Sequence, residues 1–104
     1  MPEVKVEVYP WLSTILKSRS RKTRGGRLLL ELEIAEGETV GNLLDKLIAM
    51  EEKLRPHLFD PASGKFTDQI SIVVNDRFID LLDGLDTRLE DGDTVMLIQA
   101  WSGG

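Results

Sequence analysis

The sequence contains no cysteine. Disulfides, thiolate metal sites and cysteine nucleophiles are therefore excluded for this chain. No apolar run approaches the roughly 18–20 residues that a membrane-spanning helix requires, so we expect no membrane partner. The first residues, Met1 to Glu3, show neither the basic segment nor the apolar segment of a secretory signal. These absences together predict a cytoplasmic protein.

Residues that build catalytic centres are also sparse. His57 is the only histidine, and no other ligand lies at metal-site spacing from it. The Glu51-Glu52 pair and the scattered aspartates are typical of a solvated surface and indicate no acid–base pair. Gly25-Gly26 lacks the other residues of a phosphate-binding motif. The sequence therefore predicts neither a metal site nor acid–base catalysis.

The composition is that of one globular domain. The 104 residues are 41% hydrophobic and 30% charged, with a net charge of -5, so disorder is not indicated. Six basic and no acidic residues lie between Lys17 and Arg27, which leaves a body of about -11. Such a body argues against nucleic acid as the main partner, because that binding depends on neutralising phosphates. It favours docking onto a basic protein surface.

Alternating apolar and polar residues predict four strands. The first two cover residues 4–8 and about 27–34, and they form a hairpin around an exposed basic loop at residues 17–26. Residues 70–74 form the third strand, and residues 94–98 the last.

A single long helix is expected between the second and third strands. Thr39 has the position of an N-cap, and Val40 begins a run with the spacing of one apolar helix face. Pro56 marks the expected end of this helix, with Lys53 and Arg55 in its last turn.

Two connections complete the predicted chain. Asn75-Asp76 begins a turn into Arg77, Phe78 and Ile79. Residues 80–90 are expected to be loop with a 3₁₀ turn, anchored by four leucines. These are Leu81, Leu82, Leu85 and Leu89.

We expect the rest of the chain to be arranged around the stretch from Asp91 to Gly104. An acidic turn, Asp91-Gly92-Asp93, precedes the final strand, which leads to Gly103-Gly104. If the first and last strands lie side by side in the sheet, the helix covers one face and every apolar stripe is buried. This predicts an α+β protein of the β-grasp (ubiquitin-like) fold, with a mixed sheet of four to five strands and one main helix. The domain is expected to cover residues 1–100, followed by a flexible tail at 101–104.

These motifs resemble those of the MoaD/ThiS family of ubiquitin-like sulfur carriers over nearly the whole chain. The resemblance rests on the helix opening at Thr39-Val40-Gly41-Asn42-Leu43-Leu44, the turn at Val74-Asn75-Asp76-Arg77 and the stretch from Leu89 to Val95. The ending Trp101-Ser102-Gly103-Gly104 is similar to that of MoaD, the small subunit of molybdopterin synthase. The basic loop is longer than the family usually carries.

The resemblance implies chemistry at the carboxylate of Gly104. An E1-like (MoeB/ThiF-type) adenylating enzyme would use ATP to form an acyl-adenylate there, and a persulfide donor would convert it to a thiocarboxylate. Gly103 would provide a thread narrow enough to enter a partner's active site. The molybdopterin synthase large subunit is the expected second partner. The carrier itself would bind no cofactor and would not be an enzyme.

Strand parity predicts how a partner is held. If Val95 and Leu97 face inward, Met96 and Ile98 face outward and form an apolar patch, extended by Phe78. Alternatively, the basic loop or Trp11 covers this patch. Trp101 either enters a partner pocket or lies on its own sheet.

Three alternatives to a molybdopterin role stay open at this point. The first is a sulfur carrier for thiamine, cysteine or tRNA thiolation. The second is a ubiquitin-like modifier joined to lysines through Gly104. The third is a plain interaction domain, for which Gly103-Gly104 would be dispensable.

Overall fold

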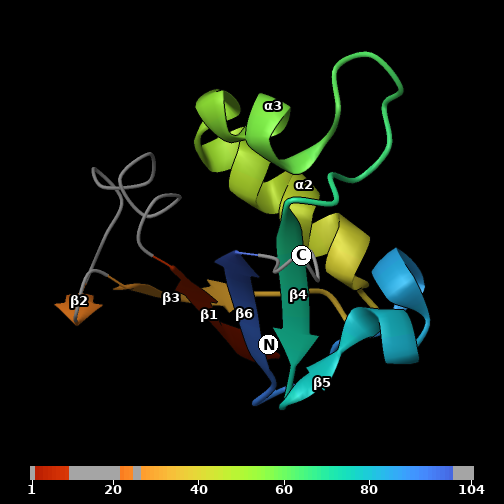
Figure 1. Cartoon of the computed structure of the whole chain (residues 1–104). Helices are drawn as coiled ribbons and strands as arrows, with labels where there is room; N and C mark the ends of the chain where they lie inside the picture. The colour runs from red at the N-terminus through yellow and green to blue at the C-terminus, as the bar shows by residue number, and fades with distance from the viewer. Residues whose placement is uncertain (1, 10–21, 25–26, 100–104) are drawn as a thin grey trace.

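The computed structural model describes residues 2–9, 22–24 and 27–99. It forms one mixed sheet with a helix across one face (Figure 1). The strands are β1 (Glu3–Val8), β2 (Lys22–Arg24), β3 (Arg27–Glu33), β4 (Ile70–Val74), β5 (Arg77–Phe78) and β6 (Thr94–Gln99). The helices are α2 (Val40–Met50) and α3 (Arg55–Leu58), with 3₁₀ turns η2 (Glu52–Leu54), η3 (Ile79–Leu81) and η4 (Gly84–Asp86). The β-grasp prediction is confirmed.

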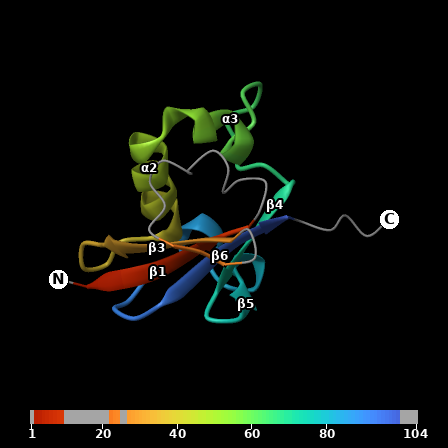
Figure 2. The same cartoon turned by 90° about the vertical axis from the view of Figure 1, so that its left-hand side faces the viewer.

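The sheet is built around the first and last long strands. Its order is β2-β3-β1-β6-β4-β5. β1 pairs with β6 in parallel and with β3 in antiparallel fashion, while β4 pairs with β6 in antiparallel fashion. The predicted central position of the first and last strands is therefore confirmed. Figure 2 shows α2 and α3 on one side of β1, β3 and β6.

Two short strands extend the sheet beyond the predicted four or five. β5 has two residues and pairs with Val73 and Val74. β2 has three residues and pairs with Arg27 to Leu29 of β3. The prediction that residues 17–26 are wholly loop is thus wrong for residues 22–24. Backbone pairing with the edge of β3 decided this, and a polar, basic sequence carries no alternating apolar signal for it.

The start of α2 agrees with the prediction, and its end does not. Thr39 forms a capping box: Asn42 N donates to Thr39 Oγ1 at 3.2 Å, and Thr39 N donates to Asn42 Oδ1 at 3.0 Å. The helix ends at Met50, because Glu51 is extended with φ -152° and ψ 99°. Pro56 lies in the first turn of α3, where a missing N–H is tolerated.

The basic residues assigned to the last turn of α2 consequently lie elsewhere. Lys53 belongs to η2, and Arg55 begins α3. No basic residue occupies the last turn of α2 itself. Their stabilising contact with the end of the long helix, expected from the sequence, is therefore absent.

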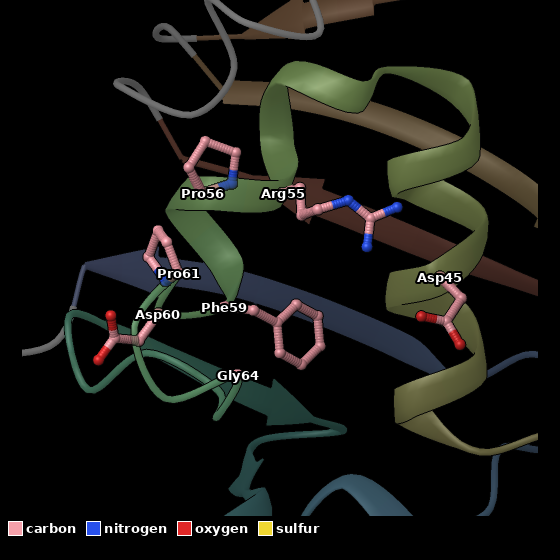
Figure 3. Close-up of a pocket in the computed structure, with 7 residues that line it drawn as sticks. All are labelled: Asp45, Arg55, Pro56, Phe59, Asp60, Pro61 and Gly64. Atoms are coloured by element: carbon pink, nitrogen blue, oxygen red, sulfur yellow. The ribbon is translucent and has the colours of Figure 1, made fainter.

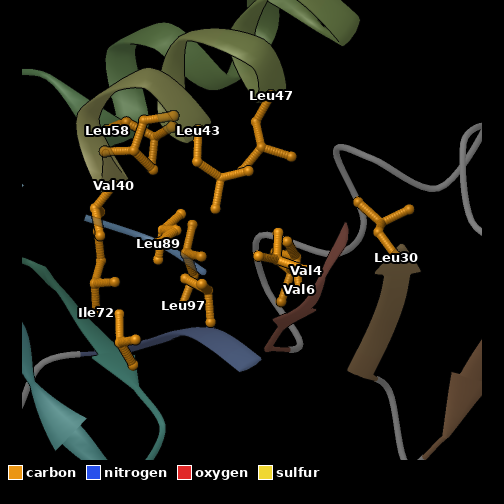
Figure 4. Close-up of a cluster of buried hydrophobic side chains, with 14 of the residues drawn as sticks. Val4, Val6, Leu30, Val40, Leu43, Leu47, Leu58, Ile72, Leu89 and Leu97 are labelled. Atoms are coloured by element: carbon orange, nitrogen blue, oxygen red, sulfur yellow. The ribbon is translucent and has the colours of Figure 1, made fainter. Parts of the chain in front are cut away.

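The core lies between α2 and the sheet (Figure 4). It comprises the inward residues of the long strands and the apolar face of α2. These include Val4, Val6, Leu28, Leu30, Val40, Leu43, Leu44, Leu47, Ile72, Val95 and Leu97. Leu89 joins this core as predicted, whereas Leu81 is 78% exposed and is not an anchor. Ile79, in the same 3₁₀ turn, is buried in its place.

No helix in the described part of the chain combines the length and the apolar character needed to cross a bilayer.

Candidate functional site

β6 is the strand that leads to the predicted reactive end of the chain. It lies between β1 and β4, and its pairing with β4 continues to Gln99, opposite Ile70. Val95 and Leu97 are buried, so their predicted inward orientation is confirmed. Trp101, Gly103 and Gly104 lie outside the described residues, and their roles remain predictions.

The Asp91-Gly92-Asp93 turn holds the start of β6 against β1. Glu3 N donates to Asp91 Oδ1 at 2.8 Å, and Gly92 N donates to Glu3 O at 2.8 Å. Gly92 has φ +88°, a conformation that glycine adopts without strain. This turn, predicted only as the start of a strand, therefore also ties the start of β6 to the start of β1.

Asp93 ties the same turn to the β4–β5 hairpin. Asn75 Nδ2 donates to Asp93 Oδ1 at 2.8 Å, and Thr94 N donates to Asn75 Oδ1 at 3.0 Å. Asn75 and Asp76 both have positive φ, as a two-residue type I′ hairpin turn requires. The sequence predicted this turn, but no local pattern indicated that Asn75 fixes β6. The consequence is a last strand whose start is held by both of its neighbours.

The sheet face away from α2 carries the predicted apolar residues. Met96 lies opposite Val73 of β4, and Ile98 lies opposite Ser71. Val73 also lies opposite Phe78 of β5. Side chains of directly opposite residues share one face. The structure thus brings Met96, Ile98 and Phe78 together, with Val73 between them; we call these four residues the outer-face patch.

Exposure within the outer-face patch is uneven. Phe78 is 46% exposed, Val73 is buried, and Met96 and Ile98 are half-buried. Val73 was not among the predicted residues of the patch, although the unbroken apolar run Ile72-Val73-Val74 is typical of a strand with two apolar faces. Trp11 and most of the basic loop, the suggested alternative cover, lie outside the described residues. Docking at the patch therefore stays a prediction.

Carboxylates border the patch on the same face of the sheet. Val4 and Val6 of β1 point into the core, so Glu3, Lys5 and Glu7 point outward. The outward neighbours on β3 are Glu33, opposite Glu3, and Glu31, opposite Lys5. Glu7 lies beside Met96 of the patch, and three further carboxylates and one ammonium group lie farther out on the same face. Such a surface complements an apolar partner surface with a basic rim.

The other titratable candidates within the described residues lie on the surface. Within the described residues, no group of three or more His, Asp or Glu side chains is placed to hold a metal ion. Glu52 forms an ion pair with Arg55 at 3.0 Å, which suits a solvated surface. His57 is exposed on α3. Gly25-Gly26 lies outside the described residues.

A shallow hollow of about 450 Å³ lies beside the helices (Figure 3). Pro56, Phe59 and Pro61 supply its apolar surface, while Arg55 and Asp45 face one another from α3 and α2. Met96, Ile98 and Phe78, the predicted site residues that the structure describes, do not line it, so it is not part of the outer-face patch.

Comparison with known proteins assigns this chain to a family. A family model described as the ThiS family matches residues 18–104. The sulfur carrier protein CysO of Mycobacterium tuberculosis is 37% identical over 71 residues, which is 67% of this chain and 76% of that protein.

Solved structures give the same result. The small archaeal modifier protein SAMP1 of Methanosarcina acetivorans matches with a TM-score of 0.73 and 27% identity, over 100% of this chain and 98% of its own. A chain from the BexX/CysO complex of Amycolatopsis orientalis matches with a TM-score of 0.70 and 26% identity, over 97% of this chain and 99% of its own. Since the family model spans most of the sequence and CysO is a close relative, the chain belongs to the ThiS/MoaD family of ubiquitin-like sulfur carriers.

Proposed function

We propose that this protein carries sulfur as a thiocarboxylate on Gly104. The observation that supports this most directly is the position of β6. It is held by β1 as far as Leu97 and by β4 as far as Gln99. A rigid body followed by a short segment ending in two glycines suits delivery of a carboxylate into a partner's active site.

The chemistry proceeds in three steps. The Gly104 carboxylate attacks the α-phosphate of ATP on an activating enzyme, and pyrophosphate leaves. The terminal sulfur of a persulfide then attacks the acyl-adenylate carbon, and AMP leaves. A thiol finally cleaves the resulting sulfur–sulfur bond, giving the thiocarboxylate and a disulfide. Membership of a sulfur-carrier family supports this route, in which the carrier supplies no catalytic side chain and ATP binds to the partner.

A more specific part of the proposal is the identity of the molecule that accepts the sulfur from Gly104. The ending Trp101-Ser102-Gly103-Gly104 supports a pterin precursor held by a molybdopterin synthase large subunit. The 37% identity with CysO supports a second acceptor, on the route to cysteine. The likeness to SAMP1 supports a third outcome, conjugation of Gly104 to lysines of other proteins.

Intact mass spectrometry of protein from its own host, kept under thiocarboxylate-preserving conditions, tests the carrier proposal. Replacing one oxygen by sulfur changes the mass by nearly as much as oxidising a methionine. Fragmentation is therefore needed to place the change on Gly104 and not on Met1, Met50 or Met96. Sulfur on Gly104 is the expected result. Unmodified Gly104, found together with isopeptide-linked species, would indicate a ubiquitin-like modifier instead of a sulfur carrier.

Deletion of the gene separates the acceptors. A molybdopterin role predicts loss of molybdoenzyme activity without a requirement for cysteine. A CysO-like role predicts the reverse. If the deletion produces neither phenotype in a host where the protein is expressed, both acceptor assignments are contradicted.

A further inference from the structure

Two large apolar side chains are exposed where β5, the last strand of the sheet, leads into η3 (Figure 1). Phe78 is 46% exposed and Leu81 is 78% exposed. Ile79, between them, is 5% exposed and belongs to the core. Leu82 N donates to Ile79 O at 2.9 Å, which closes the 3₁₀ turn. The buried Ile79 and this hydrogen bond thus hold the backbone that presents Phe78 and Leu81 to solvent.

The segment around this apolar pair is acidic. Residues 75–87 contain four aspartates and one arginine, so their net charge is -3. The four are Asp76, Asp80, Asp83 and Asp86, and all of them are exposed. None of their carboxylates takes part in an ion pair between described residues. An apolar surface with this border complements an apolar partner surface that is bordered by lysine or arginine.

A hollow lies beside Phe78. It measures about 290 Å³, and Phe66, Asp68, Phe78 and Asp80 are among the residues that line it. Asp68 and Asp80 are exposed, and Phe66 is half-buried. A side chain of a partner can therefore meet aromatic surface and two carboxylates in one place. Lysine and arginine suit such a place, because each combines an apolar stem with a positive head.

We propose that this region docks a protein surface that presents an apolar side chain flanked by lysine or arginine. We call it the acidic corner and define it by Phe78, Asp80, Leu81 and Asp83. Burial of Phe78 and Leu81 would supply the apolar contact. The carboxylates would select a basic partner and steer its approach.

The position of the acidic corner indicates which partner would use it. Phe78 lies opposite Val73, which lies opposite Met96 of β6. Gln99 is three residues beyond Met96, about 10 Å along the strand. A partner that binds both the corner and the chain beyond Gln99 would hold the protein at two separate points and so fix the direction of its end. The activating enzyme is such a partner, and to this extent the inference rests on the proposed function.

Kinetics with the host's activating enzyme test the acidic corner in the full chain. Leu81→Ser should raise the KM for the carrier about tenfold and leave kcat unchanged, because it removes docking contact and leaves Gly104 in place. Pyrophosphate release measures both constants. Leu81→Met keeps an apolar side chain and should keep the KM. Unchanged melting temperatures are expected for both variants, because Leu81 is exposed.

Charge reversal tests the electrostatic part. Asp80→Lys with Asp83→Lys should raise the KM at least tenfold at low salt and less at high salt. Glu36→Lys with Asp45→Lys is the control of equal net charge, since both residues are exposed and Asp45 lies on α2. Its KM should be nearly unchanged. An equal rise in the control would overturn the proposal, as would an unchanged KM in Leu81→Ser.

Isothermal titration calorimetry with the same enzyme separates this inference from the sulfur carrier. Binding that Leu81→Ser weakens, without any pyrophosphate release by the wild-type chain, would contradict the carrier alone. Pyrophosphate release with equal binding of wild type and Leu81→Ser would contradict the acidic corner alone. The absence of both binding and release would contradict the two proposals together.

Discussion

Asn75 and Asp93 join two turns that are eighteen residues apart in the sequence, through a 2.8 Å hydrogen bond from Asn75 Nδ2 to Asp93 Oδ1. The Asn75 Oδ1 atom accepts from Thr94 N in the same arrangement. Because Thr94 is the first residue of β6, this side chain connects the β4–β5 hairpin to the strand that carries the proposed reactive end.

Asn75→Ala should lower the free energy of unfolding by about 2 kcal/mol, from lost hydrogen bonds and from a positive φ that alanine tolerates poorly. Urea unfolding measures this change. Asp76→Ala is the matched control, because Asp76 also has positive φ but makes none of these side-chain bonds. An equal loss in both variants would show that the Asn75 contacts contribute nothing.

Thr39→Ala should destabilise the protein by about 1 kcal/mol, because the Asn42 N–H at the start of α2 loses its acceptor. Thermal or urea unfolding reports the change. Asn42→Ala removes the reciprocal bond to Thr39 N and should not add its full cost in the double variant, since the two side chains act as one box. Full additivity would contradict that coupling.

Met96→Asp should leave the fold intact and slow adenylation by the host's activating enzyme, measured as pyrophosphate release. Met96 is half-buried on the outer face, where a carboxylate remains partly solvated. Val95→Asp is the contrasting variant, because Val95 has 0% exposure and a buried charge should unfold the chain. A folded Met96→Asp variant with normal pyrophosphate release would show that the outer-face patch is not part of the docking surface.

Deleting Gly104 should abolish sulfur transfer while leaving the melting temperature nearly unchanged, because a terminal segment contributes little packing. Differential scanning calorimetry and the intact mass of the host-purified variant test the two halves of this statement. Ser102→Ala is the control, since it leaves both glycines in place. A large fall in melting temperature on deletion would mean that Gly104 is structural.

The outline of the fold could be predicted from short-range patterns. Alternation in β1 and the apolar spacing of α2 each follow from burial of one face, and this period is visible in a single segment. The Thr39 cap is equally local, since all its partners lie within four residues. These features depend on the order of neighbouring residues alone.

The ends and edges of elements could not be predicted in this way. Whether α2 continued to Pro56 depended on the backbone conformation of Glu51. The residues around Glu51 allow a helix, so its extended conformation could not be predicted. β2 forms because β3 offers an unpaired edge, and no apolar pattern marks such a strand. Ile79 and Leu81 lie in the same 3₁₀ turn, and only the packing of η3 decides that Ile79 is buried and Leu81 is exposed.

The sequence alone thus determined the β-grasp order, the inward face of β6 and the candidate at Gly104, because each is written in neighbouring residues. Only the tertiary structure decided that Asn75 holds the start of β6 and that Val73 links Met96 to Phe78. Each of these is a relationship between segments far apart in the chain. The pairing of β6 with β1 and β4, which local patterns do not specify, brings those segments together.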